Sequence, residues 1–120
     1  MRVEIKLKRI YDKSDQDDGI RILIDRLWPR GISKEEAKLD YWLKDLAPSN
    51  NLRKWFNHDP IKFAEFTKRY QEELKTGEQM KAFKELKEII SKNNNQRITL
   101  LYAAKDIDNN NAQVIKQLIQ

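Results

Sequence analysis

The stretch Arg21-Ile22-Leu23-Ile24-Asp25-Arg26-Leu27-Trp28-Pro29-Arg30-Gly31 organises the rest of the chain. It begins as a short, nearly continuous apolar run, which is the pattern of a strand buried on both faces. At Asp25 it changes abruptly to charged and rigid residues. A buried strand that ends in this way is typical of a site at the carboxyl edge of an α/β sheet. The sequence therefore predicts both the centre of the fold and the place of a candidate site.

The composition limits the classes of protein and of site. A chain of 120 residues is long enough for one domain, residues 1–120, with its own core. The sequence contains no cysteine, which excludes disulfides, thiolate catalysis and cysteine zinc sites. It has one histidine, His58, so a multi-histidine metal centre cannot form within one chain. We predict no cofactor and assign no metal ligands; magnesium binding by the carboxylates of Asp25 and Asp106 is a weakly supported alternative.

Charge and hydropathy indicate where the protein works and what it contacts. The first six residues lack the apolar run of a signal peptide, and no segment reaches the length of a membrane span, so we expect a soluble cytoplasmic protein without a membrane partner. The net charge is +5, from 24 basic and 19 acidic residues. This excess fits either a well-solvated surface or an anionic partner. Interspersed acidic residues make a small anion a better partner than a nucleic acid, and the oligomeric state is not predicted.

Hydrophobic periodicity predicts strands separated by helices. Residues 3–10 alternate apolar and polar, which predicts a strand with one face in water near a sheet edge, and residues 98–104 read as a buried strand. Ser33 and Glu36 form a capping box at a helix start. Helical spacing continues to Leu46, but residues 41–46 can equally form a third short strand. Pro48 ends either version.

Cap signals predict the remaining helices. Ser49 caps a short helix over residues 50–57, Asp59-Pro60 opens a second helix, residues 76–79 offer another capping box, and residues 108–111 start the last helix. The side chains expected to face inward are Leu52, Trp55 and Phe56; Phe63, Phe66, Tyr70 and Leu74; Met80, Phe83, Leu86 and Ile90; and Val114, Ile115, Leu118 and Ile119.

Alternating strands and helices predict an α/β fold with a small, mostly parallel sheet of three to four short strands. About five helices would flank it in a Rossmann-like three-layer arrangement.

Charged residues follow each predicted strand, and in a parallel sheet these ends gather at one edge. They are Asp12, Asp25-Arg26, Lys44-Asp45 and Lys105-Asp106. Arg26, Arg30, Lys44 and Lys105 suit a phosphate or a carboxylate, because guanidinium groups donate paired hydrogen bonds. Asp25 and Asp106 can act as general acid or base, or can simply hold the arginines. The competing interpretation is that these residues form structural ion pairs.

Three further residues join the candidate site. His58 is the one side chain whose ordinary pKa lies near neutrality, so it is a candidate acid or base, although a histidine at a helix start more often caps or packs. Trp28 lies beside basic residues, as a stacking platform does. Tyr102 is a secondary ligand-binding candidate at the end of the last strand.

The chain resembles the YeaO-like proteins of the family called domain of unknown function 488. The resemblance covers nearly the whole chain, and its most specific block is Asp25-Arg26-Leu27-Trp28-Pro29-Arg30-Gly31. The other matching segments are 9–12, 18–21, 33–35, 42–49, 52–56, 58–60, Phe66, Arg69-Tyr70 and 99–106.

The resemblance implies a small bacterial-type cytoplasmic α/β protein in which residues 41–46 are extended. It transfers a fold and a candidate surface rather than a reaction. Similar sequences often carry a histidine after the last strand, where this chain has Asn109-Asn110-Asn111. If that histidine takes part in chemistry, this protein lacks it.

Three functions fit the sequence. The first is an enzyme or sensor for a small anionic metabolite at the strand ends. The second is a nucleic-acid-binding module that uses Lys6, Lys8, Arg53, Lys54, Lys68 and Arg69. The third is a protein-interaction module without catalysis, built on the aromatic segment from Trp55 to Tyr70.

Overall fold

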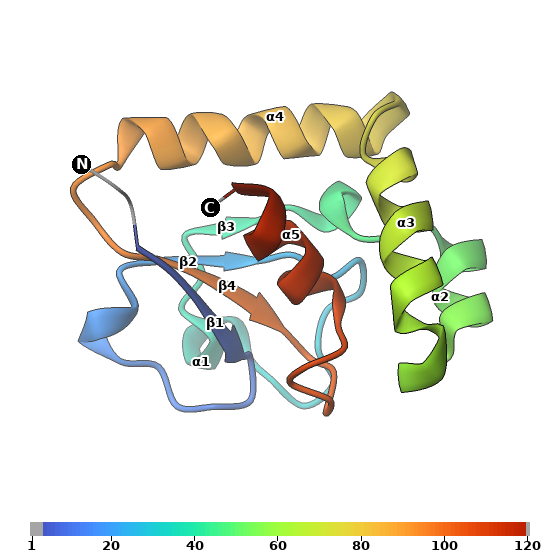
Figure 1. Cartoon of the computed structure of the whole chain (residues 1–120). Helices are drawn as coiled ribbons and strands as arrows, with labels where there is room; N and C mark the ends of the chain where they lie inside the picture. The colour runs from blue at the N-terminus through green and yellow to red at the C-terminus, as the bar shows by residue number, and fades with distance from the viewer. Residues whose placement is uncertain (1–3, 120) are drawn as a thin grey trace.

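The computed structural model describes residues 4–119 of the chain (Figure 1). Within them a sheet of four parallel strands has the order β1-β4-β2-β3. Helix α5 lies in front of the sheet and α1 behind it, so the predicted three-layer α/β fold is confirmed (Figure 1). The elements are β1 (Ile5–Arg9), η1 (Gln16–Asp18), β2 (Ile20–Leu23), α1 (Lys34–Ala37), β3 (Tyr41–Trp42), η2 (Lys44–Leu46), α2 (Asn50–Phe56), η3 (Pro60–Lys62), α3 (Phe63–Glu73), α4 (Gly77–Lys92), β4 (Ile98–Tyr102) and α5 (Asn111–Ile119).

The two central strands are buried on both faces. Ile22 pairs with Leu100 and Leu23 with Leu101, and none of these four side chains is exposed. Because side chains alternate along a strand, Ile22 and Leu100 join the main core, whereas Leu23 and Leu101 pack with Ala37 of α1 on the other face. The prediction that residues 21–24 form the buried centre of the sheet is therefore confirmed.

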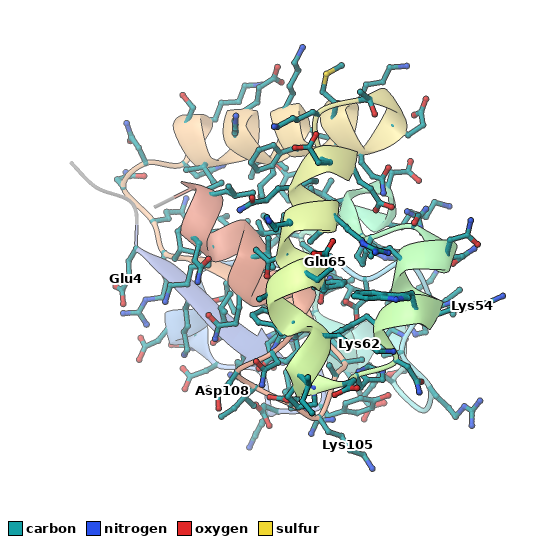
Figure 2. The ribbon with its side chains drawn as sticks, turned by 45° about the vertical axis from the view of Figure 1, so that its right-hand side comes forward. Glu4, Lys54, Lys62, Glu65, Lys105 and Asp108 are labelled. Carbon is teal, nitrogen blue, oxygen red and sulfur yellow. The ribbon has the colours of Figure 1, made fainter. Side chains whose placement is uncertain are left out.

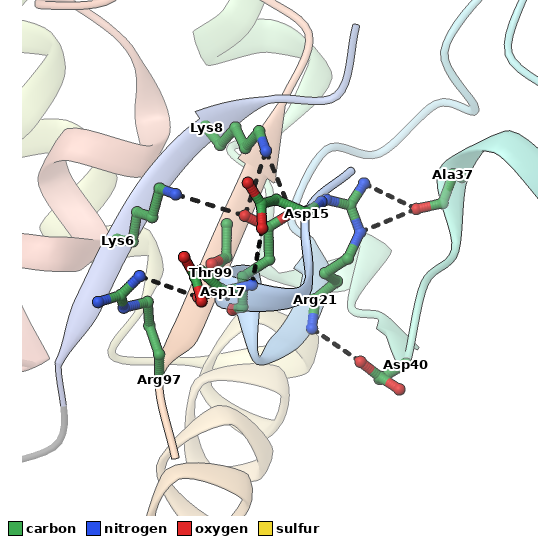
Figure 3. A network of polar contacts seen from close by, with 10 residues as sticks. Lys6, Lys8, Asp15, Asp17, Arg21, Ala37, Asp40, Arg97 and Thr99 are labelled. Carbon is green, nitrogen blue, oxygen red and sulfur yellow. Dashed lines mark hydrogen bonds and ion pairs between the residues drawn. The ribbon is translucent and has the colours of Figure 1, made fainter. Parts of the chain in front are cut away.

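The same second face carries a buried ionic cluster near the amino ends of the strands (Figure 3). Asp18 has no solvent exposure and accepts bonds from Lys6 Nζ at 3.4 Å, Lys8 Nζ at 3.1 Å and Arg21 Nη1 at 2.5 Å. Arg21 also donates to the Ala37 carbonyl from Nε and Nη2. Lys6 and Lys8 thus lie against a buried carboxylate, and the predicted wet face of β1 is wrong for Lys8, whose side chain is 14 % exposed.

For residues 41–46 the sequence allows either a continued helix or a third short strand. Tyr41 and Trp42 pair in parallel with Ile22 and Leu23, so the chain is extended there, as the family resemblance implied. A single 3-10 turn, η2, follows, so neither a helix through Leu46 nor a strand through Leu46 forms. The short helix α1 ends instead at Lys38, which adopts a left-handed backbone conformation.

Most predicted caps are present, and one is not. The Ser33–Glu36 box, the Ser49 cap and the Asp59 cap all form. The box predicted at Thr76 is wrong, because the Gln79 side chain donates to the Ala47 carbonyl and to Glu73 instead of turning back to the cap.

The buried stripes of the last two helices also differ from the prediction. Helix α4 buries Ala82, Leu86 and Ile89, and α5 buries Ala112, Val114 and Ile115. Leu118, which was expected to face inward, is 39 % exposed. Val3, the first residue of the first predicted strand, lies outside the described residues.

Candidate functional site

A cavity of about 710 Å³ opens at the carboxyl edge of the sheet. The arrowheads of β2 and β4 point toward the side where α2 and α3 stand (Figure 1). Residues that follow these strands and residues of these two helices line the cavity. We call it the strand-end cavity; it is lined by residues 25–30, 47–48, 103–106 and 109–111, with Tyr11, Arg53, Phe56, His58 and Phe66. Because parallel strands end at the same edge, segments distant in sequence share one hollow.

The loop after β2 is held in place by hydrogen bonds to its carbonyl groups. The indole of Trp42 donates to the carbonyl of Asp25 at 2.8 Å, and the indole of Trp28 donates to that of Ile32 at 2.6 Å. The Tyr11 hydroxyl donates to the carbonyl of Arg30 at 3.1 Å. These three hydrogen bonds fix the backbone of the loop and so restrict the positions of its side chains.

Asp25 joins the ends of β2 and β4 to the start of α5. Its Oδ2 accepts from the Ala103 amide at 2.8 Å, and its Oδ1 accepts from Asn111 Nδ2 at 3.2 Å. Burial raises the pKa of Asp25 above its usual value, although these two hydrogen bonds and the nearby Arg53 and His58 oppose the shift. Asp25 therefore links these segments by hydrogen bonds, and its carboxyl group has a raised pKa.

Positive side chains outnumber negative ones in the cavity wall. Four basic residues, Arg26, Arg30, Arg53 and Lys105, face two carboxylates, those of Asp25 and Asp106, which leaves two positive charges in excess. Within residues 4–119, only Arg26 of these four lies within ion-pairing distance of a carboxylate. The wall therefore carries a net positive charge.

Arg26 bridges two loops of the cavity wall. Its Nη2 donates to the Ala47 carbonyl at 3.0 Å, and its Nη1 lies 3.5 Å from Asp45 Oδ1. Its Nε is shielded from solvent and has no hydrogen-bond acceptor among the described residues. The guanidinium group is thus only partly satisfied by the protein.

Asp106 organises the turn that precedes α5. Its Oδ1 accepts from the amides of Asp108 and Asn109, and its Oδ2 accepts from Asn109 Nδ2. These hydrogen bonds lower the pKa of Asp106. Because both carboxylate oxygens accept hydrogen bonds from the turn, Asp106 is better suited to holding the turn in place than to transferring a proton.

His58 reaches the cavity from the turn between α2 and η3. Its backbone has a φ of +55°, and its ring lies 6.4 Å from the ring of Phe56. It lies close enough to Asp25 and Asp106 to contribute a small lowering of the pKa of each. Within residues 4–119, no three His, Asp or Glu side chains converge to hold a metal ion.

The cavity brings together seven of the nine predicted site residues, and the other two lie outside it. Lys44 Nζ lies 5.7 Å from the ring centre of Trp42 on the edge strand. Tyr102 is buried in β4, where burial raises the pKa of its hydroxyl.

Sequence reasoning missed several cavity residues, chiefly Arg53, Phe56 and Asn111. The spacing of Arg53 and Phe56 puts them on one side of α2, and this was the available signal. For Asn111 the available signal was its place in the segment Asn109-Asn110-Asn111, where similar sequences often carry a histidine.

Comparison of the sequence with known protein families assigns the chain to one of them. A family model described as "Inactive DUF488-N3 subclade" matches residues 4–120. The chain belongs to the DUF488-N3i family.

Relatives of this DUF488-N3i chain are found in distant bacteria. It is 45 % identical over 113 residues to the uncharacterized protein YeaO of Escherichia coli (strain K12), covering 94 % of each chain. It is 38 % identical over 115 residues to uncharacterized proteins of Mycobacterium tuberculosis (strain ATCC 25618 / H37Rv) and Mycobacterium bovis, covering 96 % of this chain and 92 % of theirs. The comparison with solved structures gave no match.

The DUF488-N3i chain has no long apolar helix in the part that the structure describes. None of the helices within residues 4–119 combines the length and the hydropathy that crossing a bilayer requires.

Proposed function

We propose that the strand-end cavity binds a small anion, a phosphate or a carboxylate, and that the protein is a cytoplasmic ligand-binding protein rather than an enzyme. The observation that carries this proposal is the set of three basic side chains without a carboxylate partner in the described chain, Arg30, Arg53 and Lys105, in one cavity wall. Charge-assisted hydrogen bonds from such groups are the usual means of holding phosphates and carboxylates.

Binding without catalysis agrees with the family and with the carboxylates. The family description contains the word "inactive". Asp106 is occupied by its turn, and Asp25 by the Ala103 amide and Asn111. An enzyme on a small anionic metabolite, with Asp25 and His58 exchanging protons, is the weaker candidate.

The contacts favour neither of the macromolecular alternatives. On the proposed nucleic-acid surface, Lys6 and Lys8 contact Asp18, and Arg69 contacts Glu65 at 2.9 Å. On the aromatic segment, Phe66 and Tyr70 are buried, and the ring of Trp55 is covered by Lys62 and by Arg69, at 5.2 and 4.2 Å from its centre.

Two neighbouring residues of α2 give a matched test of the anion site. Arg53 and Lys54 are both exposed, but only Arg53 lines the cavity, and Lys54 extends away from the molecule (Figure 2). We expect Arg53→Ala to weaken the binding of phosphate or acetate about tenfold in calorimetric titrations at low salt, because a charge-assisted contact is lost. Lys54→Ala should change it less than about twofold.

Both variants remove one positive charge from the same helix, so a general charge effect would weaken binding equally. Equal effects, or no binding by the unaltered protein, would refute the anion site. Circular dichroism of each variant checks that α2 stays folded.

A further inference from the structure

We infer that the natural ligand is an organic anion with a flat apolar or aromatic body, such as an aromatic carboxylate or phosphate, rather than a bare inorganic ion. This inference rests on the proposed anion site and specifies the class of its ligand.

The size of the cavity is the first support. A volume of about 710 Å³ lies within the range of roughly 300 to 1,000 Å³ that is typical of sites for organic ligands. A bare phosphate would leave most of this space to water and would touch only part of the wall. The cavity therefore has room for a body attached to the charged group.

The second support is the chemistry of the wall. Apolar side chains come from five of the segments around the cavity: Trp28 and Pro29 from the β2 loop, Pro48 from the next loop, Phe56 from α2, Phe66 from α3, and Ala104 after β4. A site for a hydrated inorganic ion would gain nothing from these surfaces. They match the lining of pockets that hold an apolar ligand oriented by a few polar groups.

The third support is the state of Trp28 and Leu27. The indole N–H of Trp28 is already bonded to the Ile32 carbonyl, and its ring packs edge-on against Trp42, with 5.3 Å between ring centres. What Trp28 offers the cavity is thus apolar ring surface. Leu27 lines the same cavity and its side chain is 63 % exposed. A ligand body that covers Leu27 would therefore remove apolar surface from water. Because hydrogen bonds already hold this loop, binding would not have to order it first.

The charged groups complete the match. Arg30 and Lys105 line the cavity and are exposed to solvent. Lys105 extends outward from the loop after β4 (Figure 2). The cavity therefore combines cationic groups with an apolar interior, which is complementary to a molecule that carries one charged group on an apolar body.

A matched series of ligands separates this inference from the proposed function. Acetate, 1-naphthoate and uncharged 2-naphthol are titrated into the full chain at constant ionic strength, and binding is followed by tryptophan fluorescence and calorimetry. We expect 1-naphthoate to bind at least about tenfold more tightly than acetate and than 2-naphthol, because it gains both apolar burial and charge pairing.

Two exposed apolar residues provide the variants. Leu27→Ala should weaken 1-naphthoate about three- to tenfold and leave acetate unchanged, because Leu27 contacts only the apolar body. Ile61→Ala, at a side chain that is 92 % exposed and outside the cavity, should change neither.

The outcomes distinguish the two claims. If acetate and 1-naphthoate bind equally, or if Leu27→Ala affects neither ligand, the inference is overturned while the anion site stands. If 2-naphthol binds as tightly as 1-naphthoate, or if neither acid binds, the anion site fails and the inference fails with it.

Discussion

Asp18 keeps its charge without any contact with solvent because three cations and the Asp15 amide surround its carboxylate. Burial raises the pKa of Asp18, but bonds from the Asp15 amide, Lys8 and Arg21 outweigh this effect and lower the pKa to about 2 from 3.8. Its own carbonyl accepts the Thr99 hydroxyl at 2.6 Å. Asp18 therefore ties the turn η1 to β1 and β2 through its side chain and to β4 through its carbonyl.

The lowered pKa predicts the acid stability of the protein. A folded pKa below the unfolded one means that stability is fully present above about pH 5 and is lost as the pH falls through the folded value. A shift from 3.8 to about 2 corresponds to about 2 kcal/mol. We expect urea unfolding of the unaltered protein to lose about this much from Asp18 between about pH 5 and pH 1.

Asp18→Asn tests the same residue at neutral pH. It should reduce the free energy of unfolding by about 2 to 4 kcal/mol and flatten the acid dependence, because Arg21 loses its charged partner while buried. The exposed neighbour Asp17 provides the control, and Asp17→Asn should behave like the unaltered protein. Identical acid profiles for the Asp18 and Asp17 variants would contradict this account.

At the scale of elements, the junction of η1 and β2 depends on Gly19. Its φ is +65°, and a Cβ there would overlap the carbonyl of Arg97. That carbonyl accepts the Ile20 amide at 2.9 Å at the start of β2. Only a residue without a side chain allows η1 and the strand to meet so closely.

Gly77 provides a control for a substitution at Gly19. It has the same φ of +65°, but a Cβ added at Gly77 would have no atom within 4 Å. We expect Gly77→Ala to reduce the free energy of unfolding by about 1 kcal/mol, the ordinary strain of a left-handed residue. Gly19→Ala should lose at least about 3 kcal/mol, since overlap with Arg97 is added. Equal losses in urea unfolding would show that the close approach is unimportant.

Elements with strong local signals could be predicted from the sequence, and elements set by tertiary contacts could not. The apolar run at residues 21–24 and the cap residues Ser33, Ser49 and Asp59 act locally, and each formed the predicted structure. Trp42 has helical spacing but extends along β2, because pairing with Leu23 and the bond to the Asp25 carbonyl outweigh its local preference. Gln79 similarly leaves its capping position for Ala47 and Glu73.

At the scale of the whole molecule, parallel strands explain why a site was predictable at all. Asp25 and Lys105 are far apart in sequence, yet both line one cavity because β2 and β4 are neighbours that end at the same edge. Arg53 and Phe56 complete that cavity from a helix whose placement the sequence does not encode locally. The part of the site on the strand ends could thus be inferred, and the part on α2 required the structure.

The central claim is that these strand ends form one cavity that binds an anion. The most direct measurement is a titration of the ¹⁵N-labelled chain with sodium phosphate, followed by amide chemical shifts and compared with sodium chloride at the same ionic strength. We predict phosphate-specific shifts confined to residues 25–31, Arg53 and residues 103–111, with the exposed lysines of α4 unaffected. Shifts that gather on α4, or no difference between the two salts, would contradict the account.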